Sequence, residues 1–298
     1  MDKHSENSVF ILVPVYNRRE TSLKCLHVLC QTGDLDRFQV VVIDDGSIDG
    51  TGAAIVQQYP QVTVHQGDGT LWWTGAIKKG MKYAYQQGAD YFIWLNDDCR
   101  VSAGTIADLI AFCQEKPDAV IGAQGFEMEF PDTLSFGGKR KTWRGYRFLD
   151  IPAGNVISCD MLSGNLVCLP RTVVDAVGYP NPDKTPHYGG DSMYLLRLQK
   201  AGFGLYLDSR HLVYNDANES YLCPSNWAMS PGGPFYLMRL ACNPYSALSW
   251  RLWWQFNQQA YGAWGIVMFL KKYISLLPLT IIRLLPLKIR EHYYARHH

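Results

Sequence analysis

The chain has 298 residues, and its 28 Lys and Arg against 27 Asp and Glu leave a formal charge of +1. This balance excludes a nucleic-acid binder that relies on overall positive charge. A hydrophobic share of 47%, with 13% aromatic residues, excludes a disordered chain. The 8 cysteines show no zinc or redox spacing, and the polar residues 1–8 are not expected to form a signal peptide. We therefore expect a folded cytoplasmic protein with reduced thiols.

The first two thirds of the chain alternate between apolar β-favouring runs and helical patterns. Strands are expected at residues 9–13, 40–43, 62–64, 91–95, 119–123, 160–169 and 203–213. Helices are expected from about residue 20, at 52–59, from 74 to Gly88, and at 105–115, 171–177 and 191–201. Residues 126–150 are expected to be an irregular or hairpin insertion over the site. The alternation implies right-handed crossovers and predicts an α/β protein with a mostly parallel, doubly wound sheet.

Acidic side chains follow two of these strands directly. Asp44 and Asp45 end the run at 40–43, and Asn96, Asp97 and Asp98 end the run at 91–95. Open α/β sheets bind ligands at the carboxyl ends of their strands. Adjacent carboxylates repel each other, so a metal carrying a phosphate is a natural partner. The alternative is a polar turn, since Asn and Asp are ordinary turn residues.

The loops lack the common nucleotide-binding glycine patterns. The first strand is not followed by G-x-G-x-x-G, and G-x-x-x-x-G-K-[ST] is absent. The sequence therefore supports neither a dinucleotide-binding Rossmann site nor a P-loop. Any nucleotide must therefore be held by acids, including Asp68 after the third strand, and by loop backbone.

The helix from Thr74 is preceded by two tryptophans. Trp73 and its neighbour Trp72 can stack on a sugar, or they can be core aromatics. The helix N-terminus, aided by Lys78 or Lys79, can face a diphosphate, although the lysines equally suit a solvated face.

A second region is expected to start at residue 218, so that the predicted domains are residues 1–217 and 218–298. Its apolar runs at 266–270 and 274–287 are interrupted by Lys271, Lys272, Pro278, Arg283 and Pro286. Neither run is expected to be long enough to span a membrane. We expect a helical appendage that contacts the membrane surface, or that packs on the catalytic domain or on another subunit in a homo-oligomer.

Four motifs in order resemble those of the family 2 inverting glycosyltransferases with a GT-A fold, particularly the rhamnosyltransferase-like branch. They are residues 14–18, residues 43–47, residues 95–98, and Gly190 and Asp191 with Arg197. The resemblance covers residues 9–215 and implies a Rossmann-like, doubly wound mixed sheet with a C-terminal appendage.

The resemblance also implies roles for individual residues. The base would be held by Pro14, Tyr16 and Arg18, and the base or ribose by Asp44 or Asp45. Asn96, Asp97 and Asp98 resemble the family's D-x-D element: Asp98 would bind Mg²⁺ or Mn²⁺, and Asp97 the ribose or sugar. Asp191 matches the catalytic base, although it also stands where a helix N-cap belongs. Arg197 is either a site residue or a structural ion-pair residue.

The chain departs from the family pattern at three places. Gly190 replaces an acidic residue, and Asn215 and Asp216 stand where a metal-binding histidine is expected, with His211 out of register. The Gln/Arg-x-x-Arg-Trp element of processive synthases is missing, which implies transfer of one sugar per encounter.

The resulting prediction is a metal-dependent transferase that moves one sugar, with inversion, from a UDP- or dTDP-sugar to a glycan or lipid-linked glycan. It would act in the cytoplasm, at the inner face of the cell membrane. One alternative is a catalytically decayed carbohydrate-binding or scaffold protein, which the departures at Gly190 and Asn215 favour. Another is a sugar nucleotidyltransferase, although residues 14–20 lack the Gly-rich basic loop that such an enzyme needs.

Overall fold

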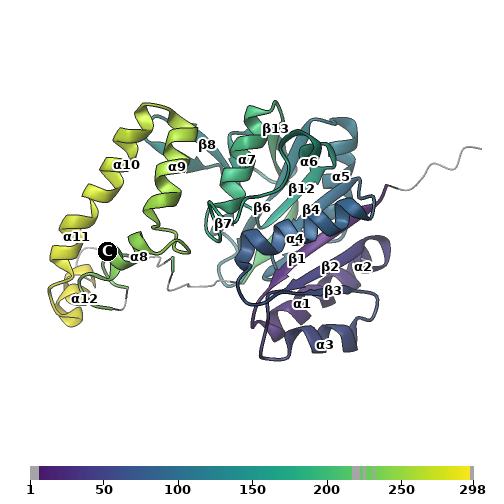
Figure 1. The fold of residues 1–298 in the computed structure, drawn as a ribbon, viewed down its shortest axis with the longest axis horizontal. Coiled ribbons are helices and arrows are strands. Elements are labelled where there is room, and N and C mark those ends of the chain that lie inside the picture. Colours follow the sequence, from purple (N-terminus) through teal and green to yellow (C-terminus); the bar gives the residue numbers. More distant parts are fainter. Residues whose placement is uncertain (1–6, 217–221, 224–225, 231, 296–298) are drawn as a thin grey trace, which may run out of the picture. The chain divides into compact units, whose positions relative to one another are not determined.

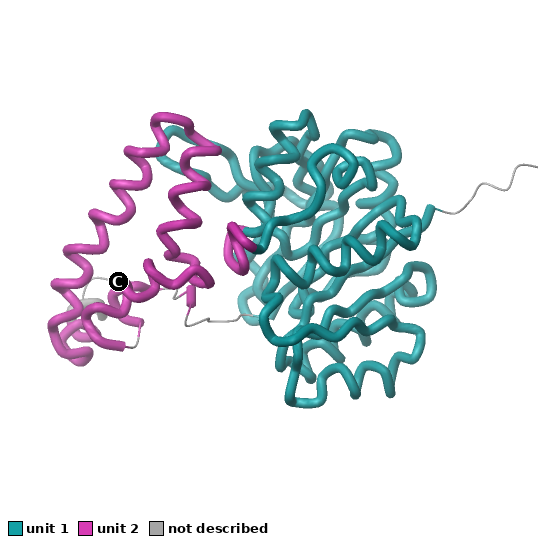
Figure 2. The backbone as a smooth tube through the Cα atoms, viewed as in Figure 1, with its two compact units in different colours: residues 1–182, 190–217 teal, residues 183–189, 218–298 magenta. Residues whose placement is uncertain are grey.

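The computed structural model describes residues 7–216, 222–223, 226–230 and 232–295. The chain divides into two compact units, which Figures 1 and 2 show. Unit 1 consists of residues 1–182 and 190–217, and unit 2 consists of residues 183–189 and 218–298. Residues 183–189 thus belong to unit 2 although they precede the predicted boundary.

Unit 1 is built on a mixed sheet in the order β10-β13-β6-β12-β4-β1-β2-β3. The strands of this path are β1 (Val9–Val15), β2 (Gln39–Asp44), β3 (Thr63–Gln66), β4 (Tyr91–Leu95), β6 (Ala119–Glu127), β10 (Val156–Cys159), β12 (Leu166–Pro170) and β13 (Gly204–Asn215). Two short strands extend it, β5 (Cys99–Val101) on β13 and β7 (Leu134–Phe136) on β6. β3, β2, β1 and β4 are parallel, whereas β12 runs antiparallel to β4 and β6. The sheet is therefore mixed, as the GT-A resemblance implied.

Helices cover both faces of this sheet (Figure 1). They are α1 (Arg19–Gln31), α2 (Asp34–Arg37), α3 (Thr51–Gln58), α4 (Trp72–Gln86), α5 (Thr105–Glu115), α6 (Thr172–Val177) and α7 (Gly190–Lys200). Alternate residues of β1 and β4, such as Ile11 and Ile93, pack in one core cluster with residues of α1, α3 and α5. On the other face, the ring of Trp94 contacts that of Tyr194 in α7. Strands buried on both faces explain the nearly continuous apolar runs.

Residues 126–150 contain a β-hairpin, one of the two forms expected for the insertion. Strands β8 (Gly138–Thr142) and β9 (Gly145–Phe148) pair antiparallel, and β8 also pairs with β11 (Met161–Leu162). This gives a separate three-stranded sheet. Its end is tied to the loop after β11, because the N–H of Ser163 donates to the carbonyl of Gly137 at 2.9 Å.

Unit 2 is helical. Its helices are α8 (Tyr236–Cys242), α9 (Trp250–Tyr261), α10 (Trp264–Ile274), α11 (Leu276–Ile282) and α12 (Leu287–Ala295). α9 and α10 form an antiparallel hairpin (Figure 1), which Gly262 closes with a φ of +57°. The hairpin is tight because Gly265 has no side chain: a Cβ there would overlap with the backbone of Asn257. The rings of Trp254 and Phe269 pack edge to face across it, 5.2 Å apart.

The segment from Trp264 to Ile282 is long and apolar enough to cross a membrane by length and composition, and most of it is exposed. The expectation that neither apolar run reaches this length was wrong. Helical bonding continues between the runs, since the N–H of Ser275 donates to the carbonyl of Lys271. Pro278 lies in the first turn of α11, where a missing N–H is tolerated.

Candidate active site

Three parallel neighbours, β4, β1 and β2, bring their carboxyl ends to one edge of the sheet. Val15 at the end of β1 lies opposite Asp44, and the N–H of Asp45 donates to the carbonyl of Val15 at 3.0 Å. β4 ends at the same edge and is followed by Asn96 and Asp97. Acids that are far apart in sequence therefore share the edge at which open α/β sheets bind ligands.

The buried Asp45 carboxylate organises the loop between β3 and α4. Its Oδ1 accepts the N–H groups of Gly69 and Leu71 at 3.0 and 3.1 Å, and its Oδ2 accepts that of Trp72 at 2.8 Å. Trp72 has a φ of +51°, a left-handed conformation that is costly for a bulky residue. Hydrogen bonds to a charged acceptor hold this conformation. Since an ionised carboxylate has about four acceptor positions, Asp45 keeps capacity for a ligand hydroxyl.

Asp44 is also buried, and its carboxylate fixes the turn after β2. Oδ1 accepts the N–H of Ser47 at 2.9 Å, and Oδ2 accepts the side-chain amide of Gln66 at 3.3 Å. Gly52 leaves room for this carboxylate, because a Cβ at residue 52 would overlap with Asp44 Oδ2. Asp44 therefore stabilises the turn at this edge of the sheet through internal hydrogen bonds.

The loop after β1 is tied to the same turn. Asn17, with a φ of +49°, donates its N–H to Ser47 Oγ at 2.8 Å and accepts the N–H of Ile48 at 2.8 Å. Pro14 lies in β1 opposite Ile43. Tyr16 is 53% exposed, which leaves an aromatic ring at the edge that is available to stack on a flat ligand.

The Arg18 guanidinium bridges the two carboxylates that follow β4. Its Nη1 lies 2.9 Å from Asp97 Oδ1, and its Nη2 lies 3.2 Å from Asp98 Oδ2. Asp97 Oδ2 also accepts the hydroxyl of Ser22 in α1 at 2.8 Å. Burial raises the pKa of Asp97 to about 6, against the effect of Arg18, and the charge of Asp98 adds to the rise. This pair of acids thus needs a cation beside it, and Arg18 supplies one.

Two further side chains lie beside this pair, at the end of β13. The N–H of Asp216 donates to the carbonyl of Asp98 at 3.0 Å, and its carboxylate pairs with Arg100 at 2.6 Å. The buried Oδ1 of Asn215 has no hydrogen-bond partner. His211 is engaged elsewhere, since its Nε2 lies 2.9 Å from Asp108 Oδ2. Oxygen atoms of Asn215 and Asp216 therefore stand where the metal-binding histidine was expected.

The carboxylates of Asp97 and Asp98 fit a divalent cation that takes its other ligands from phosphate and water. The described residues include no group of three His, Cys, Asp or Glu side chains that could hold a metal. Mg²⁺ is commonly held by one or two carboxylates, with phosphate oxygens and water as the other ligands. Asp97 and Asp98 meet that requirement, and the Arg18 guanidinium between them marks a point that attracts positive charge.

Trp73 joins the tip of β4 to Asp191. Its Nε1 donates to Asn96 Oδ1 at 2.9 Å, and its ring packs edge to face on Trp94. Gly164 lies between Trp73 and Asp191, because a Cβ there would meet both side chains. The N–H of Gly164 donates to Asp191 Oδ2 at 2.8 Å. Trp73 thus contacts Asn96 directly and lies beside the glycine whose N–H holds Asp191.

Asp191 lies inside the first turn of α7, because the helix begins at Gly190. The expectation that it occupies the N-cap position was therefore off by at least one residue. Its Oδ1 accepts the N–H of Ser192 at 2.6 Å, so both carboxylate oxygens are oriented by backbone N–H groups.

The packing of α4 against α7 explains the glycine at position 190. A Cβ at Gly190 would overlap with Thr74 Oγ1 in α4. An acidic side chain beside Asp191 therefore has no room here, and the departure from the family pattern is a packing requirement of these two helices.

Lys139 in β8 was missed by the sequence analysis. Its Nζ lies 4.5 Å from the centre of the Phe148 ring, and burial lowers its pKa while the negative charge of Asp191 opposes the change. A buried cation thus lies within electrostatic reach of Asp191. No sequence pattern marks it, because Lys139 stands in a run with Arg140 and Lys141 that resembles a solvated hairpin face.

Other predicted residues lie further from these contacts. The Asp68 carboxylate accepts the N–H and hydroxyl of Thr70, and these hydrogen bonds lower its pKa. Lys78 is half-buried in the second turn of α4, whereas Lys79 donates to the carbonyl of Gln66. Arg197 donates to the backbone carbonyls of Val177, at the end of α6, and of Tyr179, which is a structural role.

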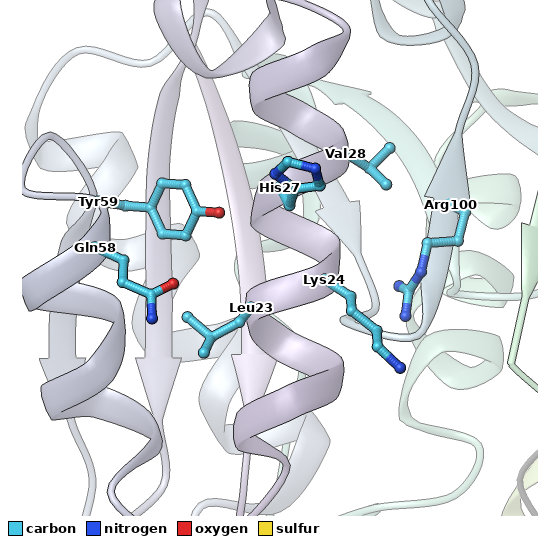
Figure 3. A pocket seen from close by; sticks show the side chains of 7 residues that line it. All are labelled: Leu23, Lys24, His27, Val28, Gln58, Tyr59 and Arg100. Atoms are coloured by element: carbon cyan, nitrogen blue, oxygen red, sulfur yellow. The ribbon is translucent and has the colours of Figure 1, made fainter.

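An open pocket lies elsewhere on unit 1, between α1 and α3 (Figure 3). Its polar lining includes Lys24, His27, Tyr59 and Arg100. None of the predicted site residues lines it, so we assign it no part in the candidate site.

Comparison with known proteins is consistent with this architecture. Residues 10–156 match the model of the family described as Glycosyl transferase family 2. Two curated relatives are the uncharacterized proteins Rv1525 of Mycobacterium tuberculosis and Mb1552 of Mycobacterium bovis. Each is 24% identical over 204 residues, which cover 67% of this chain and 70% of the relative.

Two solved structures share the fold. The crystal structure of GalNAc-T7 with UDP, GalNAc and Mn²⁺ superposes with a TM-score of 0.59 at 12% identity, covering 92% of this chain and 57% of that one. The structure of residues 1–349 of S. aureus TarS superposes with a TM-score of 0.54 at 16% identity, covering 90% and 72%. The chain thus spans little more than half of the GalNAc-T7 chain, and the likeness concerns the fold.

Proposed function

We propose that this protein is a glycosyltransferase that moves one sugar from a nucleotide-diphospho-sugar to an acceptor hydroxyl, with inversion at the anomeric carbon. Two observations carry the proposal: Arg18 pairs with Asp97 and Asp98 at the end of β4, and Trp73 bonds to the adjacent Asn96 while it packs beside Gly164, whose N–H holds Asp191. The family 2 match at residues 10–156 supports the reaction class.

The donor nucleotide would bind at the carboxyl ends of β1 and β2. Tyr16 offers an exposed ring for the base, and Asp45 offers a carboxylate oxygen for a base N–H or a ribose hydroxyl, whereas Asp44 holds the turn beside it. Pro14 and the Asn17 turn fix the loop that carries Tyr16. We propose a UDP- or dTDP-sugar as donor; the crystallised GalNAc-T7 is a fold relative that holds UDP.

The diphosphate would lie beside Asp97 and Asp98. A bound Mg²⁺ or Mn²⁺ would neutralise the charge that develops on the leaving diphosphate. Asp98, which is the more accessible of the two, would be the main protein ligand, and Asp97 would hold the ribose or sugar hydroxyls. Arg18 pairs with both carboxylates and is placed to contact the phosphates.

Asp191 would act as the general base. Its carboxylate would take the proton of the acceptor hydroxyl, whose oxygen attacks the anomeric carbon as the bond to the diphosphate breaks. Attack from the side opposite the leaving group inverts the configuration. The N–H groups of Gly164 and Ser192 orient the carboxylate for this role, and Lys139 supplies a positive charge nearby.

The acceptor we propose is a glycan or lipid-linked glycan, which places the reaction at the cytoplasmic face of the cell membrane. For the transferred sugar, our proposal rests on the sequence motifs, which resemble the rhamnosyltransferase-like branch. The decisive experiment is to incubate the protein with a panel of UDP- and dTDP-sugars and Mn²⁺ and to measure the release of nucleotide diphosphate. A transferase should hydrolyse one donor slowly without acceptor. A carbohydrate-binding scaffold would release none from any donor, and a nucleotidyltransferase would release pyrophosphate from a nucleoside triphosphate.

A further inference from the structure

We propose that unit 2 binds the surface of an anionic lipid bilayer through the outward face of α10 and α11, with both helices lying in the plane of the interface. This face, the apolar stripe, consists of Val267, Leu270, Ile274, Leu277 and Ile281. The five residues recur at intervals of three and four, and their side chains are 45% to 65% exposed. They therefore line one side of a continuous helical segment.

The polarity of this segment is the reverse of that in a soluble helix. An amphipathic helix on a soluble protein turns its apolar face inward and its polar face to water. Here the inward residues include Lys272, Thr280 and Arg283 beside the apolar Leu276. The Arg283 guanidinium donates to the carbonyls of Trp227 and Ser230, so its hydrogen bonds are made inside unit 2. In water, the apolar side of the segment would be exposed to solvent, whereas the polar side faces the protein interior.

Exposed apolar residues continue beyond the stripe, from the end of α11 through the following turn into α12. They are Ile282, Leu284, Leu285, Leu287 and Ile289. Contiguous exposed apolar surface on this scale marks an interaction site in a natural protein.

The charge of the region identifies the partner. Residues 218–298 contain eight Lys and Arg against two Glu, although the whole chain is nearly neutral. Lys271 and Lys288 are exposed beside the stripe. Each basic residue near an anionic bilayer contributes roughly 1 kcal/mol of attraction. An apolar face flanked by lysines is the composition of helices that lie in the headgroup boundary.

The aromatic residues of the α9–α10 hairpin add to this match. Trp250, Trp254 and Trp264 are each 41% to 45% exposed. Tryptophan is enriched at the boundary between hydrocarbon and water, where its ring is buried and its N–H stays solvated.

The packing of α9 against the other side of α10 argues against a helix that crosses the bilayer. α10 packs along α9, which presents Arg251, Gln255 and Gln259 in the same hairpin. Burying α9 in hydrocarbon together with α10 would strip water from these polar groups. A position in the interface buries the stripe and leaves α9 accessible to water.

A second copy of the chain could also cover a stripe with three-and-four spacing. Two such surfaces would, however, bring two strongly basic regions together, and like charges oppose that association. An anionic bilayer satisfies both the apolar side chains and the charge.

The test uses the full chain and flotation with vesicles of phosphatidylcholine alone or mixed with phosphatidylglycerol. The test variant is L270Q/I274Q. The matched control is V56Q/L212Q, which changes two residues of unit 1 that are 54% and 52% exposed. The bilayer would bury both aliphatic side chains, and each burial strengthens partitioning about tenfold. Their replacement should therefore weaken partitioning into the vesicles on the order of 100-fold. Thermal unfolding of both variants checks that they fold.

We expect the wild type and the control to float with the anionic vesicles, to release in high salt or alkaline carbonate, and to stay behind with phosphatidylcholine alone. L270Q/I274Q should stay behind in every case.

Equal flotation of L270Q/I274Q and the control would overturn the assignment of the stripe. Resistance to alkaline carbonate would overturn the in-plane arrangement in favour of a span. A dimer in sedimentation that L270Q/I274Q dissociates, without flotation, would show that a second copy covers the stripe. Membrane binding does not depend on transferase activity, so donor hydrolysis can fail while flotation succeeds.

Discussion

Asp191 Oδ2 accepts the backbone N–H of Gly164 at 2.8 Å, and this hydrogen bond fixes the carboxylate beside the Trp73 indole. Gly164 follows the loop that is tied to the β8–β9 hairpin through Ser163. The orientation of the proposed base therefore depends on three segments that lie far apart in sequence.

Asp191→Asn should abolish transfer while sparing donor binding. The amide cannot accept a proton, and loss of a general base costs about 10²- to 10⁴-fold in rate. The measurements are sugar transfer to an acceptor and protection of the fold by UDP with Mn²⁺. Ser192→Ala is the matched control, since only its backbone N–H contacts the carboxylate. Normal turnover of Asp191→Asn would refute the base assignment.

Gly190→Ala should destabilise unit 1, because the new Cβ would overlap with Thr74 Oγ1. Overpacking of this kind costs about 1 to 3 kcal/mol. Urea unfolding of Gly190→Ala, Thr74→Ala and the double variant measures the coupling between the two positions. The double variant should be more stable than the sum of the single effects predicts, since Thr74→Ala removes the clashing hydroxyl. Additive effects would show that α4 and α7 adjust at no cost.

The sequence predicted the sheet and its acidic strand ends because these depend on local patterns. Apolar runs that end in carboxylates reveal where parallel strands deliver side chains, as Asp45 and Asp97 show. It could not predict Lys139, Gly164 or the overlap at Gly190, since each depends on which hairpin or helix packs nearby. It also missed the helical continuity through Ser275, because lysines and a proline interrupt the apolar pattern there.

Asp98→Ala should abolish the metal-dependent part of donor binding. The remaining carboxylate of Asp97 is buried and paired with Arg18, so a cation would lose its more accessible ligand. A ligand that binds only the folded state raises the melting temperature, so the added shift of UDP with Mn²⁺ over UDP alone reports this binding. Asp132→Ala, which removes an exposed carboxylate of unit 1, should keep the full shift. A shift unchanged by Asp98→Ala would exclude Asp98 as the ligand.

Lys139→Met should lower transfer without lowering stability. Burial of the Lys139 ammonium disfavours its charged form, as its lowered pKa indicates, so an apolar replacement of similar length relieves that penalty. Transfer should nevertheless fall, because the positive charge near Asp191 is lost. Lys141→Met, in the exposed part of the same hairpin, should leave transfer unchanged. Full activity of Lys139→Met would confine this residue to packing on Phe148.

Lys272→Met should remove an alkaline rise in stability that the wild type shows. Burial lowers the pKa of Lys272 to about 8 from its usual 10.5. Between these two pH values the unfolded chain binds the proton and the folded chain does not, so the stability of the folded state increases as pH rises. Below about pH 8 the folded state carries the full penalty of a buried ammonium, partly offset by the Trp253 ring 3.7 Å away. Thermal unfolding across this range should therefore show a slope in the wild type and in Lys271→Met, whose side chain is exposed, but a flatter profile in Lys272→Met. An equal slope in all three proteins would assign the pH dependence to another group.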